Sequence, residues 1–181
     1  MREVEVKAKV ENLSELETKL VALGCTFSEP LHQDDHIYNK KGDSLGAQYR
    51  GMVVLRIRNQ NGVYIVTLKQ QQENEKDNIE REVVIDDSAA MNDILAIIGY
   101  EETMHVKKVR RSCAYQEMTI CLDEVEGLGS FIEVEKLTEG EGGSIVQEEL
   151  FLFLETLGVS RNQRVLEGYD TQLYNKQKKQ L

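Results

Sequence analysis

The chain has 181 residues, and its 32 acidic and 22 basic side chains give a formal net charge of −10. Hydrophobic residues make up 40% of the chain, which is enough for a core and excludes a wholly disordered protein. The acidic balance argues against nucleic acid or an anionic membrane as a broad partner, because both need a net positive surface. We expect one domain over residues 1–175 and a short polar tail over 176–181.

The sequence also predicts where the protein resides. No apolar run approaches the ~20 residues of a membrane span, and residues 1–5 lack the apolar core of a signal peptide. The three cysteines, Cys25, Cys113 and Cys121, form no C-x-x-C pair. These features favour a compact protein in the reducing cytoplasm.

The first predicted elements are a strand over residues 3–10 and a helix after it. The strand alternates strictly, with Glu3, Glu5 and Lys7 on one face and valines and alanine on the other. Asn12 followed by Glu15 resembles a capping box, and Gly24 supplies the helix stop.

This strand–helix unit recurs twice. Residues 80–85 form a predicted strand before a helix that ends at Gly99, and residues 131–137 precede a helix that begins at Ser144 and ends at Gly158. Each of the three strands carries a Glu-x-Glu pair, and this spacing places both carboxylates on one face. The pairs are Glu3/Glu5, Glu80/Glu82 and Glu133/Glu135.

The intervening segments predict strands that carry cations. These strands are residues 52–58 with Arg56 and Arg58, 63–69 with Lys69, 106–115 with Lys108 and Arg110, and 118–123 with Asp123 at its end. A polar loop is expected over 70–78 and a short helix near 169–174, while 40–49 remains unassigned.

The fold class is therefore α+β, rich in antiparallel strands. In a sandwich, these charges would simply be the solvated outer faces. If the sheet instead closes into a barrel, closure removes its open edges and the three amphipathic helices can cover an apolar outside. The mixed charges would then line the lumen, where charges without partners are very costly.

The charged residues indicate phosphate chemistry. Clustered carboxylates favour hard cations such as Mg²⁺ or Mn²⁺, whereas Arg and Lys from several strands suit phosphate oxygens. The sequence has no phosphate-binding glycine loop of the G-x-x-x-x-G-K-[ST] or G-x-G-x-x-G type. A polyphosphate lying through the barrel explains both sets of charges.

Several motifs, in order along nearly the whole chain, resemble the CYTH proteins, or triphosphate tunnel metalloenzymes. They are Glu3-Val4-Glu5-Val6-Lys7, Asp35-His36-Ile37-Tyr38, Leu55-Arg56-Ile57-Arg58, Thr67-Leu68-Lys69, Glu80-Arg81-Glu82, Lys108-Val109-Arg110, the stretch from Leu122 to Glu135, and Gly168 to Leu173. Two positions depart from the family pattern. Gln70-Gln71 stands where Gly-Pro is frequent, and Cys113 where an aromatic residue is frequent.

The resemblance implies a closed eight-stranded antiparallel barrel with a charged tunnel and flanking helices outside. It implies that Mg²⁺ or Mn²⁺ binds carboxylates among Glu3, Glu5, Glu80, Glu82, Asp123, Glu133 and Glu135. The triphosphate would be bound by Lys7, Arg56, Arg58, Lys69, Lys108 and Arg110. The catalytic candidates are Lys7, Arg56, Lys108 and Asp123.

By the same resemblance, the favoured activity is that of a class IV adenylyl cyclase, which converts ATP to cyclic AMP and pyrophosphate, and a homodimer is expected. A thiamine or inorganic triphosphatase is the alternative, and a noncatalytic module that binds polyphosphate or RNA 5′ ends is a third. The motifs do not report which phosphorus lies beside the nucleophile. We expect His32, His36 and His105 to be scattered surface or loop residues, and Cys121 to be a packing residue.

Overall fold

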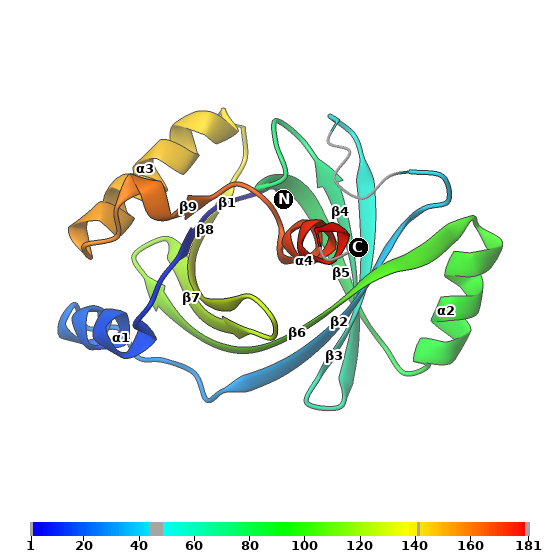
Figure 1. Cartoon of the computed structure of the whole chain (residues 1–181), viewed down its shortest axis with the longest axis horizontal. Coiled ribbons are helices and arrows are strands. Elements are labelled where there is room, and N and C mark those ends of the chain that lie inside the picture. Colours follow the sequence, from blue (N-terminus) through cyan, green and yellow to red (C-terminus); the bar gives the residue numbers. More distant parts are fainter. Residues whose placement is uncertain (1, 44–48, 141, 180–181) are drawn as a thin grey trace.

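Eight antiparallel strands close into a barrel in the computed structural model, which describes residues 2–43, 49–140 and 142–179 (Figure 1). The sheet order is β5-β4-β3-β2-β6-β7-β8-β1, and pairing of β1 with β5 closes it. The strands are β1 (Arg2–Lys9), β2 (Leu31–Lys40), β3 (Val53–Gln60), β4 (Val63–Gln71), β5 (Asp77–Ile85), β6 (Tyr100–Tyr115), β7 (Met118–Val125) and β8 (Gly129–Thr138). The expected closed barrel and fold class are confirmed.

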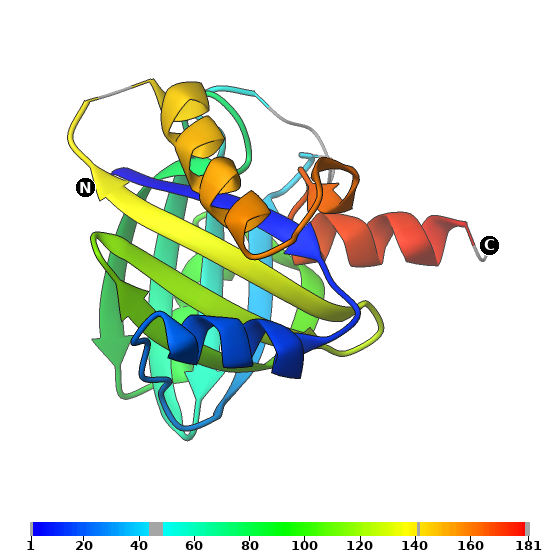
Figure 2. The same cartoon turned by 90° about the vertical axis from the view of Figure 1, so that its left-hand side faces the viewer.

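The helices lie outside the wall and at one opening (Figures 1 and 2). They are α1 (Leu13–Ala22), α2 (Ser88–Ile97), α3 (Gly143–Thr156) and α4 (Tyr169–Lys178), with a short 3₁₀ turn and strand β9 (Arg164–Val165) before α4. α1 and α3 cover one side and α2 covers the opposite side, whereas α4 begins at one opening of the barrel and projects outward from it. None of the described helices has both the length and the apolar character that a lipid bilayer requires.

Strand alternation sorts the barrel wall into an apolar outside and a charged inside. Val4, Val6 and Ala8 of β1 are almost fully buried against residues of α1 and α3, such as Leu20 and Leu154. On the other side, Leu95 of α2 packs against the outward residues of β3 and β4. The helices therefore hold the barrel closed through its outer face, and the inner face is left for polar residues.

The ends of several elements test the expectations from the sequence. The Asn12 cap is confirmed, because its side chain accepts a hydrogen bond from the Glu15 amide. The helix expected to begin at Ser144 begins one residue earlier, at Gly143, and its N-cap Gly142 has no side chain with which to cap it. The expected loop over 70–78 is shorter, because β4 continues to Gln71 and β5 begins at Asp77.

Strand β2 was not predicted as a strand, and β6 begins earlier than expected. β2 reads Leu-His-Gln-Asp-Asp-His-Ile-Tyr-Asn-Lys and has polar residues on both faces, so it lacks the apolar alternation that marks a half-buried strand. β2 is a strand because it pairs along most of its length with β3 on one side and β6 on the other, and the sequence pattern does not indicate this pairing. Residues 44–48 of the unassigned 40–49 segment lie outside the described residues.

Replacing Leu154 in α3 with Ala should lower the free energy of unfolding by about 2–5 kcal/mol, because the side chain is fully buried and its removal leaves a cavity. The matched control is Leu152→Ala on the same helix, where the side chain is 51% exposed and the expected change is within about 0.5 kcal/mol. Urea denaturation of both variants measures the difference. Equal losses would contradict the assignment of the α3 face that contacts the barrel.

Candidate functional site

A cavity of about 290 Å³ lies inside the barrel. Among the described residues, nine acidic and seven basic side chains line it, contributed by seven of the barrel strands, the β4–β5 loop and the start of α4. The alternation of each strand places these residues on the inner face. Twelve of the thirteen site residues predicted from the sequence line this cavity; the thirteenth, Asp123, is fully buried in its wall.

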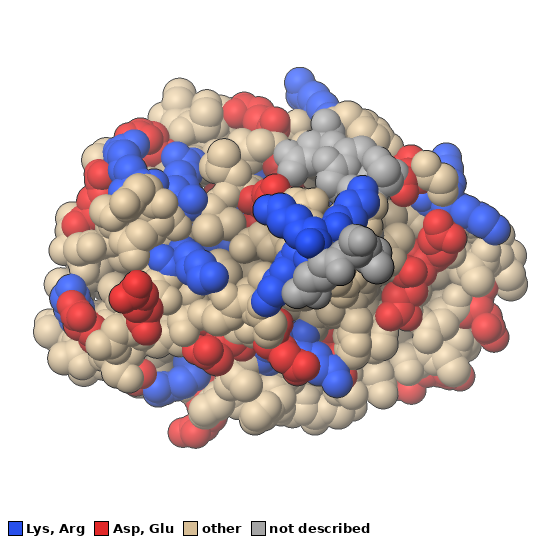
Figure 3. Space-filling model, in the orientation of Figure 1, with Lys and Arg blue, Asp and Glu red and all other residues tan. Residues whose placement is uncertain are grey.

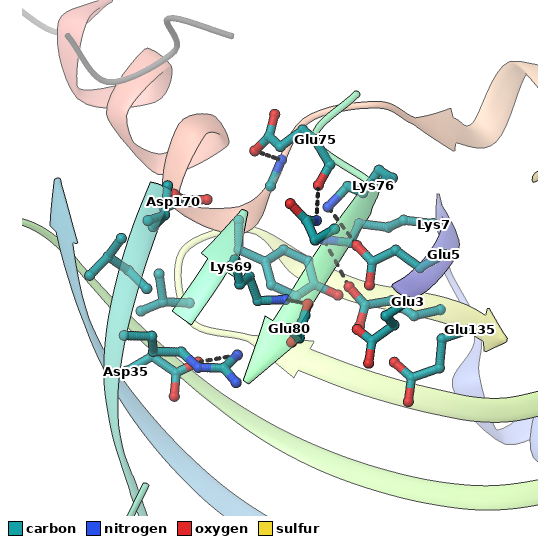
Figure 4. Close-up of a pocket in the computed structure, with 18 of the residues that line it drawn as sticks. Glu3, Glu5, Lys7, Asp35, Lys69, Glu75, Lys76, Glu80, Glu135 and Asp170 are labelled. Atoms are coloured by element: carbon teal, nitrogen blue, oxygen red, sulfur yellow. Dashed lines mark hydrogen bonds and ion pairs between the residues drawn. The ribbon is translucent and has the colours of Figure 1, made fainter. Parts of the chain in front are cut away.

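Three carboxylates converge on one side of the cavity. Glu3 and Glu5 of β1 and Glu135 of β8 each offer an oxygen, and these oxygens lie within 4.8 Å of one another (Figure 4). Burial raises the pKa of Glu3 to about 9 and that of Glu135 to about 7, and the neighbouring carboxylates add to both shifts. Such a cluster of oxygen ligands is chemically suited to a hard divalent cation.

Buried lysines hold two of the inner carboxylates. Lys76, from the loop before β5, lies with its Nζ 2.9 Å from Glu5 Oε1. Lys7 Nζ lies 2.8 Å from Glu133 Oε1 and 3.4 Å from the centre of the Tyr169 ring. Burial lowers the pKa of Lys7 to about 8, and Glu133 opposes that shift, so Lys7 remains mainly cationic at neutral pH.

The most buried anion of the site is Asp123 of β7. Arg110 donates two hydrogen bonds to its carboxylate, at 2.7 and 2.5 Å, and also contacts Glu133. Lys108 Nζ and the Tyr169 hydroxyl complete its surroundings, at 3.2 and 3.0 Å from Oδ2. Asp123 therefore fixes two cations and the first residue of α4, and none of its described contacts is to another inner carboxylate.

A second pairing centre lies on the opposite wall. Arg58 of β3 makes a two-pronged contact with Asp35 of β2, at 2.7 and 2.8 Å. Burial acts to raise the pKa of Asp35, but the Arg58 hydrogen bonds and the charge of Arg56 outweigh it and hold the pKa well below its usual range. Arg56 bonds to Thr67 and Glu82, and its buried Nε has no hydrogen-bond partner. A buried donor without a partner is a natural contact for a ligand oxygen.

The third acidic pair, Glu80 and Glu82, is not part of the carboxylate cluster, although the charge of Glu80 helps to raise the pKa of Glu3. Lys69 Nζ lies 2.5 Å from Glu80 Oε1, and Glu82 is exposed beside Arg56. One oxygen from each of Glu3, Glu5 and Glu135 thus lies within 4.8 Å of the others, although Glu5 also pairs with Lys76. The other four predicted metal ligands lie outside this group and each contacts a cation: Glu80, Glu82, Asp123 and Glu133. The assignment of metal binding to any of these seven carboxylates remains a prediction.

The sequence-based prediction omitted four residues that shape the cavity. Asp35 belonged to a recognised motif but was given no role, and Lys76 lies in a segment interpreted as a plain polar loop. Glu75 accepts hydrogen bonds from the Gly168 amide, at 2.6 Å, and from Thr171, and so holds the start of α4. Tyr169 stood in the C-terminal motif, which was the signal for its position.

The two departures from the family pattern fall on different sides of the wall. Gln71 lines the cavity, so it can alter the tunnel. Cys113 packs in the outer core with Cys25 and is not a lining residue.

Cys121 is buried beside the inner charges, and burial raises its thiol pKa. The histidines lie at the surface as expected, but two of them are not scattered, because His36 and His105 stack on each other.

Comparisons with known proteins agree with this architecture. A sequence model described as "CYTH domain" matches residues 1–169. A protein of Methanocaldococcus jannaschii named "Putative adenylate cyclase" is 30% identical over 173 residues, which are 93% of this chain and 97% of the relative. The PH1819 protein of Pyrococcus horikoshii has a solved structure with a TM-score of 0.79 at 28% identity, over 96% of this chain and 99% of that one.

A more distant solved structure shares the fold at 19% identity and a TM-score of 0.57, covering 92% of this chain and 90% of that one. It is a Hippeastrum protein named "Putative adenylyl cyclase" and described as having a dominant triphosphatase activity. At this level of identity, the likeness concerns the fold alone.

Metal affinity should rise with pH. Because Glu3 and Glu135 have raised pKa values of about 9 and about 7, they hold protons at pH 6 that a cation must displace. We expect the Mn²⁺ dissociation constant to fall by about tenfold per pH unit for each displaced proton between pH 6 and 8. Titration calorimetry in buffers of different ionisation enthalpy measures both the affinity and the proton release.

The control for that titration is the Glu3→Gln, Glu5→Gln double variant, which should lose the binding. Affinity that is independent of pH, or that survives in the double variant, would place the ion elsewhere.

Proposed function

The chain belongs to the CYTH domain family, and we propose that it is a divalent-metal-dependent adenylyl cyclase, converting ATP to cyclic AMP and pyrophosphate within the barrel. The observation that carries the proposal is the convergence in one cavity of a carboxylate cluster and seven basic side chains, among the described residues. The name of the Methanocaldococcus jannaschii relative supports the cyclase activity specifically.

The basic residues would bind the triphosphate. They come from four different strands, β1, β3, β4 and β6, so they can surround a chain of phosphates from several directions. Arginine suits paired phosphate oxygens because its guanidinium donates in a planar fork, whereas lysine acts as a point charge. The unpartnered Arg56 Nε is available to a phosphate oxygen without breaking an existing bond. The six residues are Lys7, Arg56, Arg58, Lys69, Lys108 and Arg110.

The inner carboxylates would hold these cations in place before substrate arrives. Asp35 fixes Arg58, and Asp123 fixes Lys108 and Arg110. An array held this way loses little side-chain freedom on binding and needs little reorganisation during reaction. The ion pairs also keep the cavity from carrying an uncompensated positive charge in the absence of substrate.

The donor set fits a hard divalent ion. Glu3, Glu5 and Glu135 would hold it, because oxygen ligands from carboxylates are those that Mg²⁺ and Mn²⁺ prefer. When bound, such an ion supplies positive charge at phosphate oxygens and lowers the pKa of an attacking hydroxyl. In the cyclase reaction, the ribose 3′-oxygen forms a bond to the α-phosphorus, the hydroxyl proton is released, and pyrophosphate leaves.

The rest of the nucleotide would use the apolar part of the cavity. At about 290 Å³, the cavity is at the lower end of the ~300–1,000 Å³ typical of ligand sites, so we place the triphosphate inside and the nucleoside towards an opening. Ile37, Met52, Val54 and Val106 are the aliphatic lining residues and would contact the base and ribose.

A triphosphatase is the second candidate, and one feature of the lining favours it. Among the described lining residues, Tyr169 is the one aromatic ring, and it is already packed between Lys7 and Phe131. No described lining residue therefore offers a free ring for a purine to stack on. A hydrolase for thiamine triphosphate or an inorganic triphosphate would not need a ring on which a purine stacks. The dominant activity of the Hippeastrum protein belongs to this class.

Product analysis separates the candidates. Purified protein is incubated with ATP, thiamine triphosphate or tripolyphosphate, with Mg²⁺ or Mn²⁺, and the products are resolved by chromatography. We expect cyclic AMP and pyrophosphate from ATP. Orthophosphate without any cyclic nucleotide would contradict the cyclase and support a triphosphatase. Tight binding that is independent of metal, without turnover, would instead indicate a noncatalytic polyphosphate-binding module.

Replacing Arg56 with Ala should weaken triphosphate binding by about tenfold to a hundredfold, because it removes charge-assisted hydrogen bonds worth about 1.5–3 kcal/mol. The measurement is the dissociation constant of a nonhydrolysable ATP analogue. Arg81→Ala is the matched control, since Arg81 lies on strand β5 of the same wall but is exposed and is not a lining residue. Equal losses in the two variants would mean that affinity depends on overall charge and not on this contact.

A further inference from the structure

A second group of ligand-type side chains lies on the outer surface of the barrel, where β2 pairs with β6. Asp34 and His36 are two residues apart on β2 and therefore share its outer face. His105 of β6 is the direct register partner of His36. Asp34 and His36 are partly accessible to solvent and His105 is exposed. Asp35, which lies between Asp34 and His36 in the sequence, is buried and faces Arg58 inside the barrel.

The two imidazoles lie side by side, and both are close to the carboxylate of Asp34. Their rings stack with centroids 4.5 Å apart and planes inclined by 20°. His105 Nε2 contacts Asp34 Oδ1, and His36 Nε2 lies 3.9 Å from the same oxygen. One ligand atom from each of the three side chains lies within 4.8 Å of the others. Three donors thus converge on one point above the β2–β6 ladder.

A fourth residue orients this arrangement. Glu102 of β6 contacts His36 Nδ1 through Oε1 at 2.9 Å. A carboxylate hydrogen-bonded to one ring nitrogen fixes the imidazole and leaves the other nitrogen available as a metal ligand, an arrangement found behind many metal-binding histidines. In this structure the available nitrogen is Nε2, the one directed towards Asp34.

We propose that Asp34, His36 and His105 form a binding site for a borderline divalent transition metal such as Zn²⁺, separate from the tunnel. Two imidazoles and one carboxylate are a ligand set that Zn²⁺ accepts with a further position left for water. Mg²⁺ and Ca²⁺ prefer oxygen ligands alone, so this group selects a different class of ion from the carboxylate cluster inside. An ion among the three donors would replace the direct Asp34–His105 hydrogen bond.

The site would join two strands that carry charged residues of the inner face. β2 holds Asp35, the partner of Arg58, and β6 holds Lys108 and Arg110. An ion that binds the folded state but not the unfolded state stabilises the folded state. Binding of an ion at this site should therefore stabilise the whole barrel. Lys107 lies opposite Asp34 on the same face, but it is exposed, so solvent and salt screen its charge.

The test is a titration with Zn²⁺ and with Co²⁺ in the presence of excess Mg²⁺, which occupies oxygen-only sites. We expect one equivalent of Zn²⁺ to bind, and Co²⁺ to give the visible absorption of a site with nitrogen ligands. His36→Ala and His105→Ala should each weaken binding by at least tenfold. The matched control is His32→Ala, which removes an exposed histidine from the same strand but outside the group.

A second readout is thermal unfolding. Zn²⁺ at about a hundred times its dissociation constant should raise the melting temperature by roughly 5 °C or more in the wild-type chain and in His32→Ala, but not in His36→Ala. Metal-free variants are compared by circular dichroism, so a folding defect is distinguished from a lost ligand. Triphosphate turnover with Mg²⁺ alone should be the same in His36→Ala and the wild type.

Two results would overturn the proposal. One is the absence of any Zn²⁺ binding tighter than roughly 0.1 mM in the wild-type chain. The other is tight binding that is unchanged in both His36→Ala and His105→Ala, which would assign the ion to the tunnel carboxylates. Because Zn²⁺ binding and thermal unfolding are measured without ATP turnover, failure of the proposed cyclase activity would leave these two tests intact.

Discussion

The structure depends on one electrostatic constraint: charged side chains placed inside a closed barrel must have partners. Desolvation makes an isolated buried charge cost several kcal/mol, and removal of one member of a buried pair leaves that cost uncompensated. Arg58 with Asp35, Lys7 with Glu133, and Arg110 with Asp123 meet this constraint, and each pair links two neighbouring strands. Ion pairing is therefore what allows the polar face of these strands to point inward.

The same constraint explains how an acidic protein can bind a highly anionic ligand. The lining has more acidic than basic side chains, but the raised pKa values of Glu3 and Glu135 keep protons in the cavity when no metal is bound. A divalent ion can displace those protons and add charge of the same sign. The basic side chains would then exchange carboxylate partners for phosphate oxygens and stay close to where they lie now.

The net charge of −10 is consequently a poor guide to the site, because the distribution of charge decides what the cavity can bind. The exterior shows the same local variation. Basic side chains gather on the face from which α4 projects, and the last turn of this helix carries Lys176 and Lys178 (Figure 3). Cations at this end complement the helix dipole and present positive potential beside an opening of the barrel.

The strands that could be predicted from the sequence are those in which polar and apolar residues alternate with a period of two. β1 and β3 have an apolar outer face and a charged inner face, so their strand character and their site residues could be read directly. β2 could not, because its outer face carries Asp34 and His36 while its inner face carries Asp35, and a strand that is polar on both sides has no alternation of polarity. Lys76 was also missed, because a loop residue has no periodic neighbours, and its partner Glu5 lies 71 positions away in sequence.

The histidines show why pairing between strands carries information that spacing along a chain does not. His36 and His105 are far apart in sequence and show no ligand spacing, yet the antiparallel register of β2 and β6 makes them direct partners. From Leu31 to Ile37 the β2–β6 ladder keeps one register, so in this stretch the inner contacts of the two strands constrain the outer ones as well. Packing that positions Asp35 and Lys108 for the cavity therefore also sets Asp34, His36 and His105 against one another on the outside. This strand pair thus presents the Asp35 carboxylate and the cations Lys108 and Arg110 to the cavity on one face and imidazoles to solvent on the other.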